Sequence, residues 1–223
     1  MLIAFEGIDG AGKGTQSLEL ARRLTDAGYR VRHLGFPRYS ETFFGQRIGD
    51  FLNGRFGQLW DLPPFLISLL FAGDRLESRE LLLSCIEEYD AVILDRYVAS
   101  NVAHQSARCE RQEQRDVQEW IEHIEYGIHQ LPRADVNLLF DLPVAQAQAL
   151  VAKKQQRDYT EQAADLQEAD ATYLGLVRET YLDIAGRQPN WQVISLLDGD
   201  RLRSVDEVAT QVQKFIEPML RRG

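Results

Sequence analysis

The most informative stretch of the chain is Leu2-Ile-Ala-Phe-Glu6 followed by Gly7-Ile-Asp-Gly-Ala-Gly-Lys-Gly-Thr15. The first run is short and apolar, like a buried strand, and the second is a glycine-rich turn that leads into a helix. Gly7, Gly12 and Lys13 fit the pattern G-x-x-x-x-G-K, and a strand before it and a helix after it are the context that this motif requires. The stretch predicts a phosphate-binding loop, in which backbone N–H groups, the lysine and the helix N-terminus attract the anion.

The loop departs from the strict motif at one position. Residue 14 is Gly14, where serine or threonine would hold Mg²⁺, and Thr15 comes one residue later. Either Thr15 takes that role or magnesium is held elsewhere. The alternative reading of the whole stretch is an ordinary glycine-rich turn between a strand and a helix.

The composition indicates a globular protein without a general affinity for nucleic acid. Of the 223 residues 44% are hydrophobic, which excludes a disordered chain, and the formal net charge is −9, so any positive site must be local. Cys85 and Cys109 make neither a disulfide framework nor a zinc site, and Cys85 is expected in the core. We recognise no signal sequence and no apolar run of membrane length, which favours a cytoplasmic protein without a membrane partner.

Apolar runs and helical patterns alternate along the chain without an internal repeat or a linker, which predicts a single domain over residues 1–223. Strands are expected over residues 2–6, 29–34, 91–94, 136–140 and 192–196. Helices are expected over residues 15–27, 41–52, 63–89, 112–130, from 143 onward, 166–185 and 204–220, the last with a capping box of Ser204 and Glu207. This order predicts an α/β fold with a central five-stranded parallel sheet and helices on both faces.

Ligands of such a sheet gather at the carboxyl ends of its strands. The glycine-rich loop, Phe36-Pro-Arg38 and Asp95-Arg-Tyr97 all come at such ends. Phosphoryl transfer requires positive charge and a metal around the moving group; Lys13 and Arg96 supply charge, and Asp95 is placed to hold Mg²⁺ through water. The alternative for Asp95 and Arg96 is a capped strand end with a surface ion pair.

The segment of residues 153–165 is polar and charged and lacks an apolar stripe. It carries Lys153, Lys154 and Arg157. We interpret it as a lid that brings a cation over the phosphates and excludes water, because the glycine-rich loop has no arginine of its own. The alternative is a solvated charged loop.

Phe71 and Arg75 stand four residues apart in a predicted helix and so share a face. An aromatic ring there can stack on a flat base while the arginine reaches its polar edge. Spacing alone favours core packing for Phe71 and a surface pair for Arg75. Ser100 and Asn101 likewise either bind a ligand or cap a helix.

Four motifs follow one another along the first half of the chain. They are Phe5-Glu-Gly-Ile-Asp-Gly-Ala-Gly-Lys13 with Thr15-Gln16, Phe36-Pro-Arg-Tyr39, Leu70-Phe-Ala-Gly-Asp-Arg75 and Asp95-Arg-Tyr-Val-Ala-Ser-Asn101. In this order and spacing they resemble the thymidylate kinase family of nucleoside monophosphate kinases. The resemblance implies a P-loop kinase fold with a lid, the reaction ATP + dTMP → ADP + dTDP with Mg²⁺, and a homodimer.

The resemblance also implies roles for residues on the donor side. Lys13 would act on the transferring group, Asp9 would contact the acceptor's 3′-hydroxyl or a metal, and Lys154 or Arg157 would act from the lid. The residues implied around ATP are Gly7, Ile8, Asp9, Gly10, Ala11, Gly12, Lys13, Gly14 and Thr15.

On the acceptor side, Arg38 and Arg96 would hold the phosphate of dTMP, in a site lined by Phe36 and Tyr39. Phe71 would stack on thymine, Arg75 would reach its carbonyl group, and Asn101 would read the ring N3. The implied acceptor residues are Asp9, Phe36, Arg38, Tyr39, Phe71, Arg75, Arg96, Ser100, Asn101, His104 and Gln105, and the implied metal ligands are Asp9 and Asp95.

The chain departs from the family pattern at His104, where the family usually has tyrosine or phenylalanine against the sugar, and at Ser106, where many bacterial members have glycine. The lid offers one arginine, and lysine cannot reproduce its planar fork. Two other functions stay open: a kinase of adenylate or of a deoxynucleoside, because Gly10–Thr15 is also typical of adenylate kinases, and a non-catalytic nucleotide switch. The missing hydroxyl after Lys13 disfavours the switch.

Overall fold

The computed structural model describes residues 1–152 and 170–220. Its centre is a five-stranded sheet of order β2-β3-β1-β4-β5, in which all neighbouring strands are parallel. The strands are β1 (Leu2–Glu6), β2 (Val31–Gly35), β3 (Ala91–Asp95), β4 (Val136–Asp141) and β5 (Trp191–Ser195). The predicted parallel sheet is therefore confirmed. The lid predicted over residues 153–165, with Lys153, Lys154 and Arg157, lies outside the described residues.

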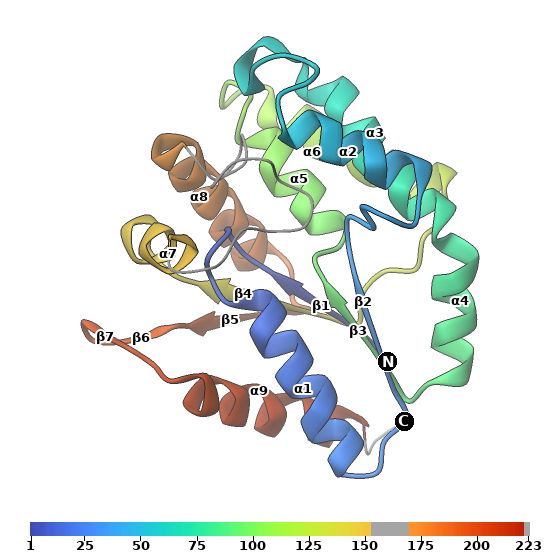
Figure 1. Cartoon of the computed structure of the whole chain (residues 1–223), viewed down its shortest axis with the longest axis vertical. Coiled ribbons are helices and arrows are strands. Elements are labelled where there is room, and N and C mark those ends of the chain that lie inside the picture. The colour runs from blue at the N-terminus through green and yellow to red at the C-terminus, as the bar shows by residue number, and fades with distance from the viewer. Residues whose placement is uncertain (153–169, 221–223) are drawn as a thin grey trace.

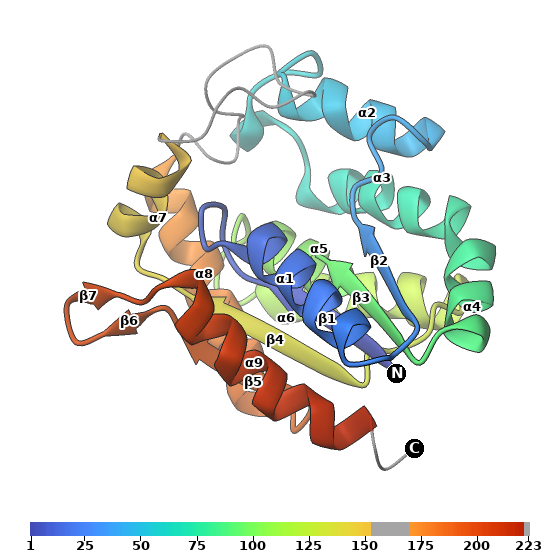
Figure 2. The same ribbon diagram turned by 60° about the horizontal axis from the view of Figure 1, so that its bottom comes forward.

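Helices cover both faces of the sheet, as Figures 1 and 2 show. On one face α1 (Lys13–Asp26) packs against α9 (Val205–Leu220), and on the other α5 (Val98–Ser106) packs against α8 (Ala171–Arg187). A further pair, α2 (Phe43–Leu52) and α3 (Pro64–Glu77), packs beside α5. The shorter elements are η1 (Leu59–Asp61), α4 (Arg79–Glu88), α6 (Gln114–Glu122) and α7 (Val144–Val151). Among the described residues, no helix is both long and apolar enough to cross a membrane.

The single helix expected over residues 63–89 is divided at Ser78 into α3 and α4. The Ser78 hydroxyl donates to the carbonyl of Asp74, 2.9 Å away, and the Ser78 N–H donates to the carbonyl three residues back. Such back-bonding by serine bends helices. The same hydroxyl accepts a hydrogen bond from Arg38, so the bend depends on a contact that spacing does not reveal.

The helix expected over residues 112–130 also differs. After α6 the chain continues as a π-helical turn, η2 (His123–Ile128), in which the His129 N–H donates to the Ile124 carbonyl at 2.8 Å. A second difference is a hairpin of β6 (Leu197–Asp198) and β7 (Arg201–Leu202), which the sequence pattern did not predict. Turns of the π type occur frequently at functional sites, and this one places Glu125 in the interior.

The parallel register brings the predicted site segments to one edge. Strand β1 is buried along its whole length, and its residue Phe5 lies opposite Asp95 of β3. Gly35 of β2 also lies opposite Asp95. The chain leaves all three strands at this edge, so the glycine-rich loop and the segments after residues 35 and 95 meet there.

The predicted buried position of Cys85 and the capping box at the start of α9 are both confirmed. Cys85 is 3% exposed. The Ser204 N–H donates to the carboxylate of Glu207, and the Glu207 N–H donates to the hydroxyl of Ser204.

Candidate active site

The loop between β1 and α1 has the geometry of a phosphate-binding loop. Gly7, Gly10 and Gly12 have φ angles of 137°, 84° and 74°, in the region that favours glycine. A Cβ atom at Gly7 would lie 2.6 Å from the carbonyl oxygen of Phe140, and one at Gly10 would lie 2.2 Å from that of Ala147. Side chains are therefore excluded, and the loop wraps closely in front of the α1 N-terminus, where backbone N–H groups attract anions.

Lys13 is buried at the start of α1, with 6% of its surface exposed. Its Nζ donates a hydrogen bond of 2.9 Å to the carbonyl oxygen of Ile8 within the loop. Burial, and then the positive charge of Arg96, lower the pKa of Lys13 to about 8. The lysine is thus held against the loop as a desolvated cation, a state that an anionic ligand would favour.

Asp95 stands at the end of β3 beside the first turn of α1. A Cβ atom on Gly14 would lie 2.9 Å from Asp95 Oδ2, so the missing side chain at position 14 leaves room for this carboxylate. Thr15, the other candidate for holding magnesium, is exposed. Oxygen atoms of carboxylates are ligands that suit Mg²⁺, and Asp95 offers them at the mouth of the loop.

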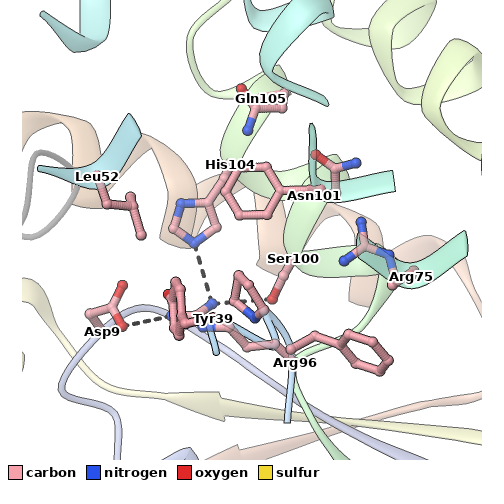
Figure 3. Close-up of a pocket in the computed structure, with 12 residues that line it drawn as sticks. Asp9, Tyr39, Leu52, Arg75, Arg96, Ser100, Asn101, His104 and Gln105 are labelled. Carbon is pink, nitrogen blue, oxygen red and sulfur yellow. Dashed lines mark hydrogen bonds and ion pairs between the residues drawn. The ribbon is translucent and has the colours of Figure 1, made fainter. Parts of the chain in front are cut away.

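A pocket with about 480 Å³ of empty space, part of it open to solvent, lies beside the loop. Ten of the eleven predicted acceptor residues line it, together with Pro37 and Leu52. The lining residues are Asp9, Phe36, Pro37, Tyr39, Leu52, Phe71, Arg75, Arg96, Ser100, Asn101, His104 and Gln105. In Figure 3, Asp9 lies on one side of this pocket, and Arg75 and Asn101 lie together on the opposite side.

Arg38 is the predicted acceptor residue that lies outside this lining. Its guanidinium donates to the hydroxyl of Ser78 at 3.1 Å and forms an ion pair with Glu41. Its backbone N–H donates to Asp74, whose carboxylate also accepts a hydrogen bond from Thr42. The side chain of Arg38 is thus directed at the junction of α3 and α4.

Arg96 joins the loop to the pocket. It has a φ of 67°, and its Nη2 pairs with Asp9 Oδ1 at 2.7 Å. Its Nη1 donates to the hydroxyl of Ser100 at 3.1 Å and lies 3.4 Å from Nε2 of His104, as the dashed lines of Figure 3 show. Burial lowers the pKa of Arg96, but the surrounding acidic groups, with Asp9 first among them, together outweigh burial, and the pKa stays well above its usual value. The alternative of a surface ion pair between Asp95 and Arg96 is therefore wrong, because Arg96 pairs with Asp9 instead.

A buried carboxylate, Glu6, supports this end of the pocket from below. It accepts hydrogen bonds from the backbone of Tyr97 at 2.9 Å, from the hydroxyl of Ser100 at 2.6 Å and from Tyr181 at 3.0 Å. Burial raises the pKa of Glu6. Glu6 and Tyr181 were not identified as site residues, although a charged residue that ends an apolar strand is a recognisable signal.

His104 is neutral, and its neighbours fix its tautomer. Because Arg96 can only donate, Nε2 of His104 accepts, and Nδ1 carries the hydrogen. Nδ1 then donates to the hydroxyl of Tyr173 at 2.8 Å, and that hydroxyl donates to the His104 carbonyl at 3.3 Å. Burial and the charge of Arg96 lower the pKa of His104 to about 3. The histidine therefore serves as a hydrogen-bond acceptor for Arg96.

At the other end of the pocket, Arg75 is 2% exposed, so the surface pair expected from its spacing is wrong. Its Nε donates to Glu125 Oε2 at 2.6 Å, and its Nη2 donates to Oε1 of the same carboxylate. Burial opposes the charge of Arg75, but Glu125 raises its pKa above the usual value. Phe71 is half-buried and packs edge to face with Phe51, with the ring centroids 6.4 Å apart.

Sequence reasoning missed Glu125, which also accepts a hydrogen bond from the amide of Asn101 at 2.9 Å. A signal was present: Glu125 follows the buried Ile121 by four residues and so places a charge on the apolar face of a helix. A charge in that position requires a partner, and the partner here is Arg75.

Comparisons with known proteins agree on one family. A sequence model described as thymidylate kinase matches residues 5–196. A thymidylate kinase of Mycobacterium tuberculosis (strain H37Rv) is 34% identical over 196 residues, which cover 87% of this chain and 91% of the relative. A probable thymidylate kinase of Archaeoglobus fulgidus is 32% identical over 221 residues, covering 99% and 96%. The solved structure of thymidylate kinase from Candida albicans has the same fold, with a TM-score of 0.76 at 23% identity, over 97% of this chain and 91% of that chain.

Proposed function

The chain belongs to the thymidylate kinase family, and on that basis we propose that it transfers the γ-phosphoryl group of ATP to dTMP. The products are ADP and dTDP. The observation that carries the proposal for this chain is the position of a pocket beside a phosphate-binding loop, with Arg96 joining the two. A kinase of nucleoside monophosphates requires this arrangement because donor and acceptor phosphates must meet in line.

The donor nucleotide binds through its phosphates at residues 7–15. The backbone N–H groups of the loop and of the α1 N-terminus point at phosphate oxygens, and Lys13 adds a charge that is already desolvated. As negative charge develops on the bridging oxygen during transfer, a fixed cation in a dry site stabilises it without reorganisation. Lys154 or Arg157 of the predicted lid supplies further positive charge.

The acceptor binds in the pocket with its phosphate toward Arg96 and its base toward Phe71. Arg96 is charged and is held by Asp9, Ser100 and His104, so its direction is set before the acceptor arrives. Phe71 provides a flat ring for stacking, and Arg75 and Asn101 face the polar edge of the base. An oxygen of the acceptor phosphate attacks the γ-phosphorus, and the bond to the ADP oxygen breaks; no covalent enzyme intermediate is required.

Magnesium is the metal that the reaction requires, and the residues fit it. Within the described residues, no group of three or more His, Cys, Asp or Glu side chains could hold a metal. Mg²⁺ in kinases needs only one or two carboxylates, because phosphates and water complete its octahedron. Asp95 and Asp9 are carboxylates at the mouth of the loop, so we assign the metal to them. Bound there, Mg²⁺ would neutralise phosphate charge.

The assembly and the compartment belong to the same proposal. Four large apolar side chains are exposed along α3, which supports a homodimer through this helix: Phe65, Leu66, Leu69 and Leu76. Cys85 and Cys109 are both free, which supports a reducing, cytoplasmic setting.

A panel of acceptors with ATP and Mg²⁺ tests the function. The purified protein should phosphorylate dTMP faster than AMP, thymidine or any other acceptor, and Lys13→Ala should lower that rate by about a hundredfold or more. Faster turnover of AMP or of thymidine would replace the proposal with another small kinase. Tight ATP binding without transfer to any acceptor would indicate a nucleotide switch.

A further inference from the structure

The base end of the pocket is organised by a carboxylate that does not line it. Glu125 is 0% exposed and accepts three hydrogen bonds: two from Arg75, and one from Asn101. Arg75 and Asn101 do line the pocket, from α3 and α5. One buried carboxylate therefore orients the side chains of two pocket residues.

The orientation of the Asn101 amide follows from chemistry. Its Nδ2 lies 2.9 Å from Glu125 Oε1 and 3.0 Å from the carbonyl oxygen of Ser68. Both neighbours are acceptors, so the amide nitrogen must face them and Oδ1 must face away. Among the described residues, Oδ1 of Asn101 is buried and has no hydrogen-bond partner. Because Asn101 lines the pocket, this acceptor without a protein partner lies at the base end, where a ligand can satisfy it.

The guanidinium of Arg75 is fixed in the same way. Its Nε and Nη2 both bind Glu125, which leaves Nη1 as the nitrogen outside this pair. Arg75 has donors only. At the base end the pocket therefore presents a donor from Arg75 next to an acceptor from Asn101.

We infer that Glu125 is a positioning residue that determines base specificity, by fixing this donor–acceptor order. The inference rests on the proposed function and names the base class within it. Thymine and uracil carry a carbonyl oxygen beside a ring N–H, which complements a donor beside an acceptor. Cytosine carries an amino group beside a bare ring nitrogen, so donor would face donor and acceptor would face acceptor.

The π-helical turn explains how the carboxylate reaches this position. Glu125 lies in η2, where the widened turn departs from the α-helical spacing of α6. Its backbone carbonyl accepts from Leu131 beyond the turn. A turn of this kind redirects a side chain, and here it supports a carboxylate beneath α3 and α5.

The test compares dTMP with dCMP as acceptors in Glu125→Gln. Glutamine keeps the size but removes the charge and replaces one acceptor oxygen with an NH₂ donor, so Arg75 or Asn101 loses an acceptor and the donor–acceptor order is held less firmly. The ratio of kcat/KM for dTMP to that for dCMP should be about a hundredfold or more in the wild type and should fall at least about tenfold in the variant. The loss should lie in KM, with kcat for dTMP at saturation little changed.

Two further variants keep the test decisive. Glu125→Asp retains the charge opposite Arg75 but withdraws the oxygens from Asn101. The ratio of kcat/KM for dTMP to that for dCMP should therefore fall at least about threefold. If Glu125→Gln does not fold, this variant alone decides the test. Glu122→Gln is the matched control: its carboxylate is one turn earlier, lies 3.8 Å from Arg133 at the surface and should leave the ratio unchanged.

The outcomes separate the inference from the function on which it rests. If the wild type does not prefer dTMP to AMP and to thymidine, the proposed function fails. If it prefers dTMP to these two acceptors but accepts dCMP as well as dTMP, or if a folded Glu125 variant keeps the wild-type ratio while losing only thermal stability, Glu125 is merely structural and the inference is wrong.

Discussion

Replacing Lys13 with methionine should make the protein more stable and, at the same time, inactive. The wild-type lysine is buried at the start of α1, and burial, followed by the charge of Arg96, lowers its pKa from 10.5 to about 8. A change of one pKa unit corresponds to about 1.4 kcal/mol, so a charged Lys13 costs the folded state about 3 kcal/mol at pH 7. Methionine removes this cost and loses the hydrogen bond to Ile8, worth about 1 kcal/mol. The net gain is about 2 kcal/mol.

The sign of the pH dependence follows from the same shift. Lys13 binds its proton more weakly in the folded chain than in the unfolded chain, so the cost is fully present below pH 8. As the pH rises from 8 toward 10.5, first the folded chain and then the unfolded chain loses the proton of Lys13, and the cost of burying the charge disappears. The contribution of the charge should therefore fall from about 3 kcal/mol at pH 7 to below about 1 kcal/mol at pH 10.

Chemical denaturation of both proteins at pH 7 and pH 10 measures the difference, and dTMP turnover at pH 7 measures function. Turnover should fall by about 10²–10³-fold, because the cation acts on the transferring group. Lys214 of α9 is exposed, and Lys214→Met should change stability by less than about 0.5 kcal/mol. If Lys13→Met is less stable than the wild type at pH 7, or if its advantage does not shrink by pH 10, the burial cost has been misjudged.

Phe71→Ala should weaken dTMP binding by about 1–3 kcal/mol in calorimetry, because the stacking surface is lost; unchanged affinity with a lower Tm would show a core role instead. His104→Phe should raise the KM for dTMP because Arg96 loses a hydrogen-bond acceptor. His104→Gln supplies an acceptor again and should keep the KM close to the wild-type value. Since the pKa of His104 is lowered to about 3, chiefly by burial, kcat/KM for dTMP should show no titration of this histidine between about pH 5 and 8; an inflection that disappears in His104→Gln would contradict its neutrality. Asp95→Asn should raise the Mg²⁺ concentration for half-maximal rate about tenfold, and an unchanged requirement would place the metal elsewhere.

The sheet was predictable because its signals are local. Strands such as β1 and β3 contain short continuous apolar runs, which are typical of parallel strands covered on both faces. The break at Ser78 was not predictable in the same way. Its hydroxyl bonds to Asp74 within the helix and also to Arg38, which comes from a distant loop. A helix of good local propensity therefore breaks at a serine that makes both a local and a tertiary contact.

The site residues differ in the same way in how far the sequence predicts their contacts. The residues of the loop and Arg96 follow strand ends, so their meeting could be inferred from the order of strands and helices. The pairing of Arg75 with Glu125 joins residues fifty positions apart. Helical spacing places Glu125 on an apolar face, but it predicts neither the partner nor the π-helical turn. Arg38 shows the same limit: its motif contributes Phe36 and Tyr39 to the pocket wall, whereas Arg38 itself pairs with Glu41, a contact that the motif does not predict.

The departure at Gly14 shows why a motif should be interpreted with its spatial neighbours. In the strict pattern the residue after the lysine carries a hydroxyl for magnesium. Here a Cβ atom at that position would lie 2.9 Å from Asp95 Oδ2, so a hydroxyl-bearing residue would require this carboxylate to shift. The two positions are far apart in the chain and adjacent in the fold, because β1 and β3 are neighbours in register. A glycine at position 14 is therefore compatible with catalysis when the carboxylate takes over the metal, which is the arrangement that we propose.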